Sequence, residues 1–306
     1  MRSLALLAPL ALAIITAALW SYRTRDYRPV FSRAAGTLVA VRDSTGVGRA
    51  SDGKSLTDVT LVSDTGLEVR VRVRARGARD GIRHPAALMI GGFSTGRRAA
   101  GVPATIDNLV LASIDYPYDG PHELEGWDWL WHLEDVRQGL LGTPPALLLA
   151  AQYLYSREDV DPHRVSMIGV SLGVPFAVAT AATDRRLAGA IYLHGGGDIR
   201  RLYEHAYGAR TPDWLTPILS RLVAWLTAPL EPTRYAGSVA PRPTLQVNAA
   251  EDRFIPRASV LALYEATRQP KRLIWLDGGH VATNEEPIVD DLMRVTLQWM
   301  AETGLR

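Results

Sequence analysis

The sequence predicts an α/β fold in which a mostly parallel sheet is covered by helices on both faces. The first observation is a series of short, continuous apolar runs, which are typical of strands buried on both faces. The second is that stretches with helical periodicity separate most of these runs, and such alternation favours parallel pairing. The expected strands are residues 86–90, 109–114, 165–169, 188–193, 244–247 and 273–276, and the expected helices are residues 130–155, 172–183, 257–267 and 288–302.

The composition is that of an ordinary globular protein. The chain has 306 residues, 47% hydrophobic and 22% charged, which suits one large α/β domain or two small ones. With 34 basic and 32 acidic residues the formal net charge is +2, and this near balance disfavours nucleic acid as a partner. Cysteine is absent, which excludes disulfides, thiolate nucleophiles and cysteine-bound zinc.

An apolar segment lies near the start of the sequence. Residues 3–20 carry no charged side chain, and as a helix they would span about 27 Å, close to the hydrocarbon thickness of a membrane. The segment fits a cleaved signal peptide, a retained membrane anchor or a buried hydrophobic helix. Trp20 and Tyr22, followed by Arg23 and Arg25, favour the anchor, because aromatic and basic residues gather at membrane interfaces. We therefore expect a cell-envelope protein, membrane-anchored or secreted, with the membrane as a partner through this segment.

The remaining chain is expected to form a tether and one domain. Residues 1–22 would be the signal peptide or anchor, residues 23–55 a polar tether with one short strand near 37–41, and residues 56–306 the domain. The domain begins with a predicted antiparallel hairpin, residues 57–63 and 67–76. Its second strand alternates valine and arginine from Val69 to Arg74, so we expect buried valines and solvent-exposed arginines.

Two features interrupt the regular pattern. Pro144 and Pro145 lie within the stretch 130–155, which predicts two helices or one sharply kinked helix. Residues 198–240 break the strand–helix alternation and contain an amphipathic stretch at 214–228. This insertion is either a small helical cap over a pocket or a helix packed on the sheet, and the sequence leaves both interpretations open.

Ser171 is the first candidate for chemistry. It lies in a Gly-x-Ser-x-Gly motif, residues 169–173, between an expected strand and an expected helix. A strand–turn–helix of this kind holds the serine on a strained turn with its hydroxyl above the sheet. The motif alone is weak evidence, since a glycine-bounded turn with an unreactive serine has the same pattern. Its position between strand and helix is what favours a nucleophile.

A serine hydroxyl needs a base, and the base needs an acid that orients it. His280 lies in a glycine-containing loop just past the last expected strand, and Asp252 follows the strand before it. Asp252 is better placed for this role than Glu251. All three candidates lie at the carboxyl ends of expected parallel strands, so we expect them to form a catalytic triad.

Two backbone N–H groups are expected to stabilise an oxyanion. Leu172, immediately after the nucleophile, would supply one, and Phe93, in the glycine-containing loop after residues 86–90, would supply the other, with Gly92 as its alternative. His194 opens a His-Gly-Gly-Gly run that has the letters of an oxyanion motif. Because it follows the nucleophile in sequence, we expect this run to end a strand and lead into the insertion instead.

The candidate substrate pocket comprises Gly92, His194 and Trp127. Trp127 and Trp131 would share one face of a helix beside the site, although packing in the core or on the surface is an alternative. The other histidines show no spacing typical of metal ligands, so neither a metal nor an organic cofactor is expected; they include His122, His132, His163 and His205.

From about residue 57 onward, the sequence resembles the α/β-hydrolase superfamily. The resemblance lies in the Ser171 motif with residues 161–165 before it, in residues 241–256 around Asp252, and in the Trp-Leu-Asp-Gly-Gly-His run that ends at His280. It is similar to the branch with acetyl-xylan esterases, dienelactone-hydrolase-like proteins and the catalytic domain of prolyl oligopeptidases. The chain departs from the pattern at Val174, where a second glycine often follows the motif, and in having no cysteine for the dienelactone hydrolase nucleophile.

The resemblance implies an α/β-hydrolase fold and a Ser171–His280–Asp252 triad. We therefore expect a serine hydrolase that cleaves a small-molecule carboxylic ester through an acyl-enzyme intermediate. A peptidase or amidase acting on short peptides, and a membrane-tethered interaction protein without turnover, are the alternatives. The sequence carries no signal for acyl length or oligomeric state.

Overall fold

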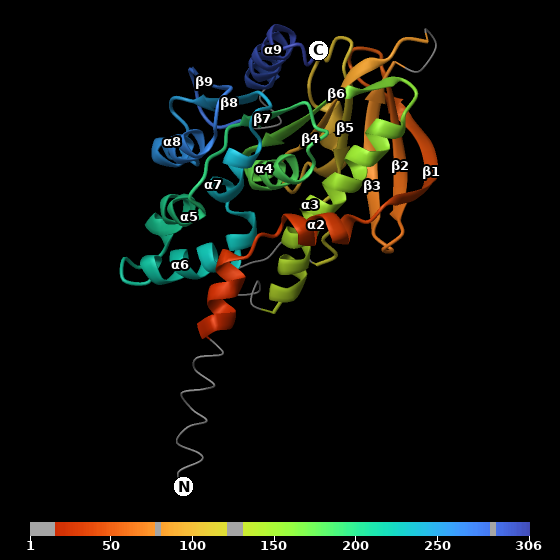
Figure 1. Ribbon diagram of the computed structural model, residues 1–306. Helices are drawn as coiled ribbons and strands as arrows, with labels where there is room; N and C mark the ends of the chain where they lie inside the picture. Colours follow the sequence, from red (N-terminus) through yellow and green to blue (C-terminus); the bar gives the residue numbers. More distant parts are fainter. Residues whose placement is uncertain (1–15, 77–80, 121–130, 282–285) are drawn as a thin grey trace.

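A computed structural model describes residues 16–76, 81–120, 131–281 and 286–306, and its centre is one nine-stranded sheet (Figure 1). The strand order is β1-β2-β3-β5-β4-β6-β7-β8-β9. β1, β2, β3 and β5 pair antiparallel in turn, whereas β5, β4, β6, β7, β8 and β9 are parallel, which confirms the expected sheet. The strands are β1 (Leu38–Arg49), β2 (Ser55–Ser63), β3 (Glu68–Ala75), β4 (His84–Ile90), β5 (Val110–Ile114), β6 (Val160–Val170), β7 (Gly189–Leu193), β8 (Thr244–Ala249) and β9 (Lys271–Leu276).

Helices cover both faces of this sheet. The α-helices are α2 (Arg28–Ala35), α3 (Leu133–Ser156), α4 (Val174–Thr183), α5 (Ile199–Tyr207), α6 (Thr216–Leu226), α7 (Pro232–Tyr235), α8 (Arg257–Ala266) and α9 (Glu286–Glu302). Successive side chains of β4 point to opposite faces. Leu88 and Ile90 join a core with α2, α3 and α4, whereas Ala87 and Met89 join a second core with α9 and the short 3₁₀ helix η1 (Gly96–Gly101).

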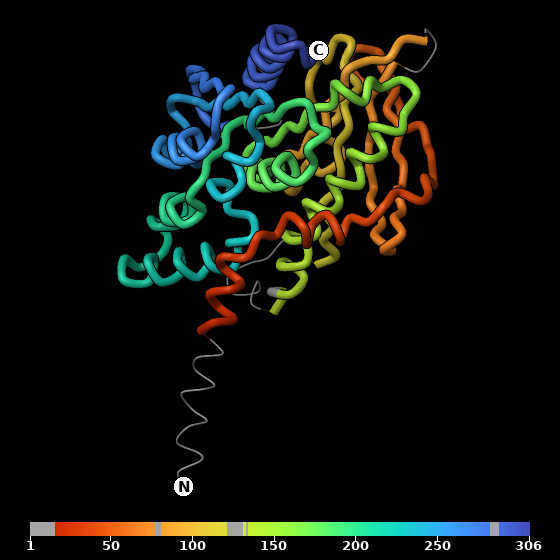
Figure 2. Tube along the Cα trace, viewed as in Figure 1, coloured from red at the N-terminus to blue at the C-terminus, as the bar shows by residue number. Residues whose placement is uncertain are grey.

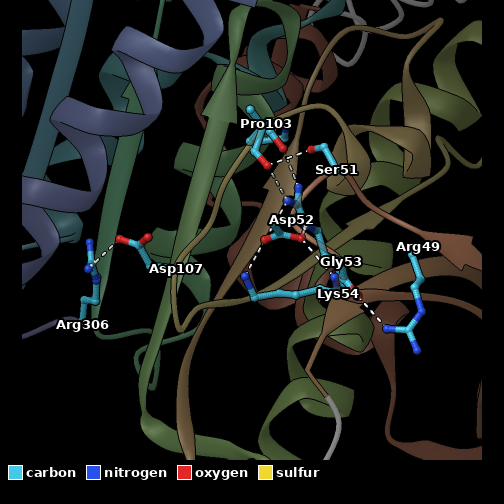
Figure 3. A network of polar contacts seen from close by, with 10 residues as sticks. Arg49, Ser51, Asp52, Gly53, Lys54, Pro103, Asp107 and Arg306 are labelled. Carbon is cyan, nitrogen blue, oxygen red and sulfur yellow. Dashed lines mark hydrogen bonds and ion pairs between the residues drawn. The ribbon is translucent and has the colours of Figure 1, made fainter.

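The predicted hairpin forms, but one expected exposure is wrong. β2 pairs with β3 from Ser55 to Val62, and Val69, Val71 and Val73 are buried as expected. Arg74 was expected at the wet face, yet it is 0% exposed. Its guanidinium pairs with Asp52 at 2.8 Å and donates to the carbonyl of Pro103 at 2.6 Å. The alternation was right, but the turn with Asp52 and the segment after η1 cover that end of the strand (Figure 3).

The segment 23–55, expected to be a tether with one short strand near 37–41, contains α2 and the longer edge strand β1. Tyr27, Phe31 and Ala35 are buried in the core beside α3 and α4, and β1 pairs with β2 from Leu38 to Arg49. The polar composition of the segment did not indicate α2, because a short helix needs only a few apolar residues at helical spacing to bury one face. α2 is therefore part of the domain's core, and β1 forms the exposed edge of its sheet.

Most of the expected N-terminal anchor lies outside the described residues, which begin at residue 16. Residues 16–24 are helical. Among the described residues, no helix is both long enough and apolar enough to cross a membrane.

The two interruptions in the sequence pattern have different outcomes. α3 runs through Pro144 and Pro145 as one continuous helix, so the two-helix alternative is not observed. Residues 198–240 are helical as expected and form α5, α6 and α7. α6 packs beside α5, and Ser220 is its one buried residue, so α6 lies apart from the sheet. Figure 2 shows α5 and α6 together at one end of the molecule, away from β1, β2 and β3.

Candidate active site

The loops after β4 and β6 meet where the strand order changes direction. β4 lies between β5 and β6, so the chain passes from one side of β4 to the other. In open α/β sheets this switch point leaves a crevice at the carboxyl ends of the strands. Gly92 and Phe93 follow β4 there, and Ser171 follows β6.

Ser171 lies on a strained turn between β6 and α4. Its backbone φ is 53°, in the left-handed region that non-glycine residues rarely adopt. A Cβ on Gly169 would lie 2.6 Å from the Cβ of Ala177, and one on Gly173 would lie 2.1 Å from the carbonyl oxygen of Ile90. Gly169 therefore lets β6 and α4 approach each other closely, and Gly173 lets the turn lie against the end of β4.

The structure brings Ser171, His280 and Asp252 together in one hydrogen-bonded chain. The Ser171 Oγ lies 2.8 Å from Nε2 of His280, and Nδ1 of His280 lies 2.7 Å from Oδ2 of Asp252. With a neutral imidazole, Nδ1–H donates to the carboxylate and Nε2 accepts from the hydroxyl. All three residues lie where the sequence placed them, after β6, β9 and β8 respectively.

Asp252 is held as an anion that orients the histidine. Its side chain is 2% exposed, and its second oxygen accepts backbone N–H groups from Phe254 at 2.8 Å and Ile255 at 2.9 Å. Burial alone would raise the pKa of this carboxyl. The hydrogen bonds from His280, Ile255 and Phe254 outweigh burial and hold its pKa below the usual value.

His194 does not line the candidate pocket, in contrast to the expectation from sequence. It is 1% exposed and lies behind the triad, with Nδ1 accepting the N–H of Val281 at 3.0 Å and lying 3.6 Å from Asp252 Oδ2. Burial, reinforced by the nearby His280, lowers the pKa of His194 to about 4 despite the opposing charge of Asp252. The N–H of His194 donates to the carbonyl of Val247 of β8, and its ring contacts the loop after His280 through Val281. It is therefore a buried neutral neighbour of the triad.

Within the described residues, one group of side chains has potential ligand atoms close enough together to hold a metal ion. Those atoms of His194, Asp252 and His280 all lie within 4.8 Å of one another. The Nδ1 atoms of both histidines already take part in hydrogen bonds, to Val281 and Asp252. The arrangement fits a hydrogen-bonded relay.

An apolar pocket of about 300 Å³ opens at Ser171. Gly92 lines it as expected, together with three residues of α9 that the sequence did not single out, Val289, Leu292 and Met293. The sequence predicted α9 as a helix, but periodicity alone does not say which face meets a pocket.

The remaining candidates lie elsewhere or outside the described residues. The ring of Phe93 packs 5.4 Å from that of Tyr116 and lines a second cavity of about 910 Å³. That cavity shares Ser94 and Thr95 with the pocket at Ser171 but does not include Ser171. Trp127 lies in the range 121–130, outside the described residues, and Trp131 is exposed just before α3. Leu172 lies in the first turn after Ser171, where its N–H was expected to act.

No family model and no curated protein sequence matches the chain, whereas solved structures match its fold. Acetyl xylan esterase 1 from a Thermoanaerobacterium species has 17% identity and a TM-score of 0.60, over 89% of this chain and 94% of that one. An acetyl xylan esterase from a Paenibacillus species has 18% identity and a TM-score of 0.60, over 90% and 94%. A puromycin-hydrolyzing peptidase from Mycobacterium tuberculosis has 17% identity and a TM-score of 0.60, over 85% of this chain and 41% of that one.

Together, the sheet topology and these similarities define an α/β-hydrolase fold. The resemblance to acetyl-xylan-esterase and prolyl-oligopeptidase-type structures that the sequence indicated is confirmed at the level of the fold.

Proposed function

We propose that the protein is a serine hydrolase that cleaves carboxylic esters. The observation that carries the proposal is the unbroken hydrogen-bonded chain from Ser171 through His280 to Asp252. Such a chain activates a hydroxyl that is otherwise a weak nucleophile. Ser171 lies on a strained turn at the switch point of the sheet. This geometry is typical of a nucleophile and not of a glycine-bounded turn with an unreactive serine.

The reaction would proceed in two steps. His280 Nε2 takes the Ser171 proton while Oγ bonds to the ester carbonyl carbon, and the N–H groups of Leu172 and of Phe93 or Gly92 would stabilise the oxyanion. The imidazolium then returns its proton to the alcohol oxygen as the carbon–oxygen bond breaks, which leaves an ester on Ser171. In the second step, water gives its proton to His280 and attacks that ester, and Ser171 leaves with the proton.

An ester is favoured over a peptide by the lining of the pocket at Ser171. None of its described lining residues carries a charge, and most are aliphatic, so nothing there would pair with the ionised ends of a short peptide. Similarity to esterases agrees with this choice, and similarity to a peptidase keeps an amide substrate as the alternative.

Active-site labelling and paired substrates test the proposal. A fluorophosphonate should label the wild type and fail to label Ser171→Ala, with Ser166→Ala, a buried serine on β6, as the control that keeps its label. p-Nitrophenyl esters should be turned over and matched aminoacyl anilides should not. Equal hydrolysis by wild type and Ser171→Ala would exclude the triad. A preference for the anilides would favour the peptidase alternative.

We further propose that residues 3–20 attach the protein to a membrane of the cell envelope. Support comes from the apolar sequence and from the position of the helix at residues 16–24. Tyr22 donates to the carbonyl of Leu226 at 2.7 Å, so residues 16–24 lie against the end of α6 (Figure 1). On α6 and just before it, Trp214, Ile218 and Leu222 share one face because they are four residues apart, and they are 71%, 54% and 42% exposed. Such an exposed apolar patch suits a lipid surface.

Cell fractionation tests this location. The full chain should stay with the membrane pellet after a carbonate wash, whereas a chain that starts at residue 26 behind a cleavable signal peptide should be released. Recovery of the full-length product in the soluble fraction, shortened near residue 20, would favour the cleaved signal peptide instead.

A further inference from the structure

The pocket at Ser171 has a defined shape and chemistry. Its walls are the loop after β4, the region of η1 with Ala99 and Val102, and the face of α9 with Val289, Leu292 and Met293. The side chains from α9 are buried in the second core, so packing fixes this wall in place. Burying alkyl surface against such a wall is favourable, whereas burying a charged or hydroxyl-rich group there is not.

The pocket is lined by the nucleophile Ser171 but not by the base His280. Ser171 and Gly92 line it, whereas among the described residues the imidazole of His280 does not. The alcohol must lie next to Nε2 of His280 to receive its proton, while the acyl group stays bonded to Ser171. The ring of His280 packs against that of Phe254, with the ring centroids 5.1 Å apart, and Phe254 is exposed to solvent. The alcohol therefore leaves toward the open side, and the acyl group occupies the pocket.

The pocket is too large for an acetyl group alone. A volume of about 300 Å³ equals about ten groups of about 30 Å³, the share of a water molecule in the liquid and close to that of a methylene. Part of that volume lies at the mouth, beside the carbonyl and the nucleophile. An alkyl chain of about four to eight carbons fills the remainder.

We infer that this site hydrolyses esters of carboxylic acids whose alkyl chain has about four to eight carbons and lies between η1 and α9. The inference rests on the proposed serine-hydrolase function and adds the class of acyl group. Each methylene that enters the pocket should raise kcat/KM about fourfold until the chain reaches the α9 wall.

A chain-length series on two pocket variants tests the inference. With p-nitrophenyl esters from acetate to dodecanoate, wild-type kcat/KM should rise to hexanoate or octanoate and then fall. Val289→Phe shortens the pocket and should lower the hexanoate-to-acetate ratio about tenfold or more. Met293→Ala lengthens it and should move the optimum to longer esters. Gln298→Phe adds the same ring to the exposed face of α9 and should leave the wild-type profile intact.

The outcomes separate the inference from the function on which it rests. Retained acetate hydrolysis shows that a variant is folded with its triad intact. If acetate is the best wild-type substrate, or if Val289→Phe and Met293→Ala both keep the wild-type profile, the pocket does not hold the acyl chain. The proposed function survives that result as long as Ser171 is still labelled. Absence of both labelling and turnover with every ester would overturn the function and the inference together.

Discussion

At the scale of single residues, Asp252 tests the relay most directly. Its carboxylate fixes the tautomer of His280 by accepting from Nδ1 at 2.7 Å. In Asp252→Asn an amide can present its N–H to that nitrogen and favour the wrong tautomer, so kcat should fall about 10⁴-fold while the fold is kept. Steady-state kinetics on a p-nitrophenyl ester measures this loss. Glu251→Gln changes the adjacent exposed carboxylate and should stay within about twofold of wild type.

His194 should make stability depend on pH. Its folded-state pKa is about 4, below the value near 6.5 of an unfolded chain. Between those values the unfolded chain binds a proton that the folded chain does not, so the free energy of unfolding falls as the pH falls. The contribution is fully present above about pH 6.5, and up to about 3 kcal/mol of it is lost near pH 4.

Urea unfolding of wild type and His194→Asn at pH 7 and pH 4.5 measures that contribution. Asparagine can still accept the N–H of Val281, but it does not titrate. The variant should therefore lose less stability than wild type over this interval. Equal losses in the two proteins would contradict a buried neutral histidine behind the triad.

The candidate site shows which residue-level facts a sequence can predict. Ser171, Asp252 and His280 could be located because the carboxyl ends of parallel strands meet at one edge of the sheet, and each residue follows such an end. His194 also follows such an end, yet its side chain is buried and accepts the N–H of Val281. The direction of one side chain depends on contacts with segments far away in sequence, which a motif does not encode.

At the scale of elements, the ion cluster at the end of β3 should matter for stability. Asp52 lies between Arg74, which is 0% exposed, and the buried Lys54, and it bonds to both (Figure 3). Asp52→Asn leaves two buried cations without their anion and should cost about 3–5 kcal/mol of unfolding free energy.

Chemical denaturation checks that cost against a matched surface pair. Arg42 and Glu68 also join neighbouring parts of this sheet edge, at 3.5 Å, but their side chains are 59% and 60% exposed. Glu68→Gln should cost no more than about 1 kcal/mol. Similar losses in the two variants would mean that burial does not set the strength of the Asp52 cluster.

The elements themselves were predicted unevenly, for a physical reason. The central strands and α8 and α9 matched closely, because elements buried on both faces or along one stripe carry a strong apolar pattern. α2 was missed, and only the first part of β1 was predicted, as a short strand near 37–41. α2 is short and β1 is an exposed edge strand, so neither needs such a pattern. α3 continues through Pro144 and Pro145 because tertiary packing overrides local preference: residues 146–151, just after the prolines, are all buried.

At the scale of the whole molecule, the N-terminal segment ties distant parts together. Gln152 of α3 accepts the N–H of Leu38, and Tyr22 donates to Leu226 of α6. The first contact belongs to the strand that follows α2, and the second to the helix at residues 16–24. Removing one contact or both should therefore lower the free energy of unfolding by different amounts.

Two truncated chains locate the boundary of the cooperative domain. A chain that starts at residue 26 loses the Tyr22 hydrogen bond and should unfold within about 1.5 kcal/mol of the full chain. A chain that starts at residue 37 also loses the burial of Tyr27, Phe31 and Ala35 and should be less stable by about 3–5 kcal/mol or more, since removing one buried phenylalanine costs that much.

Urea denaturation followed by tryptophan fluorescence compares the chains, and Phe31→Ala in the full chain should reproduce a large part of the longer truncation. If both truncated chains unfolded at the same urea concentration as the full chain, α2 would be a tether and not a part of the core. A loss confined to the chain that starts at residue 37 places the domain boundary between residue 26 and α2.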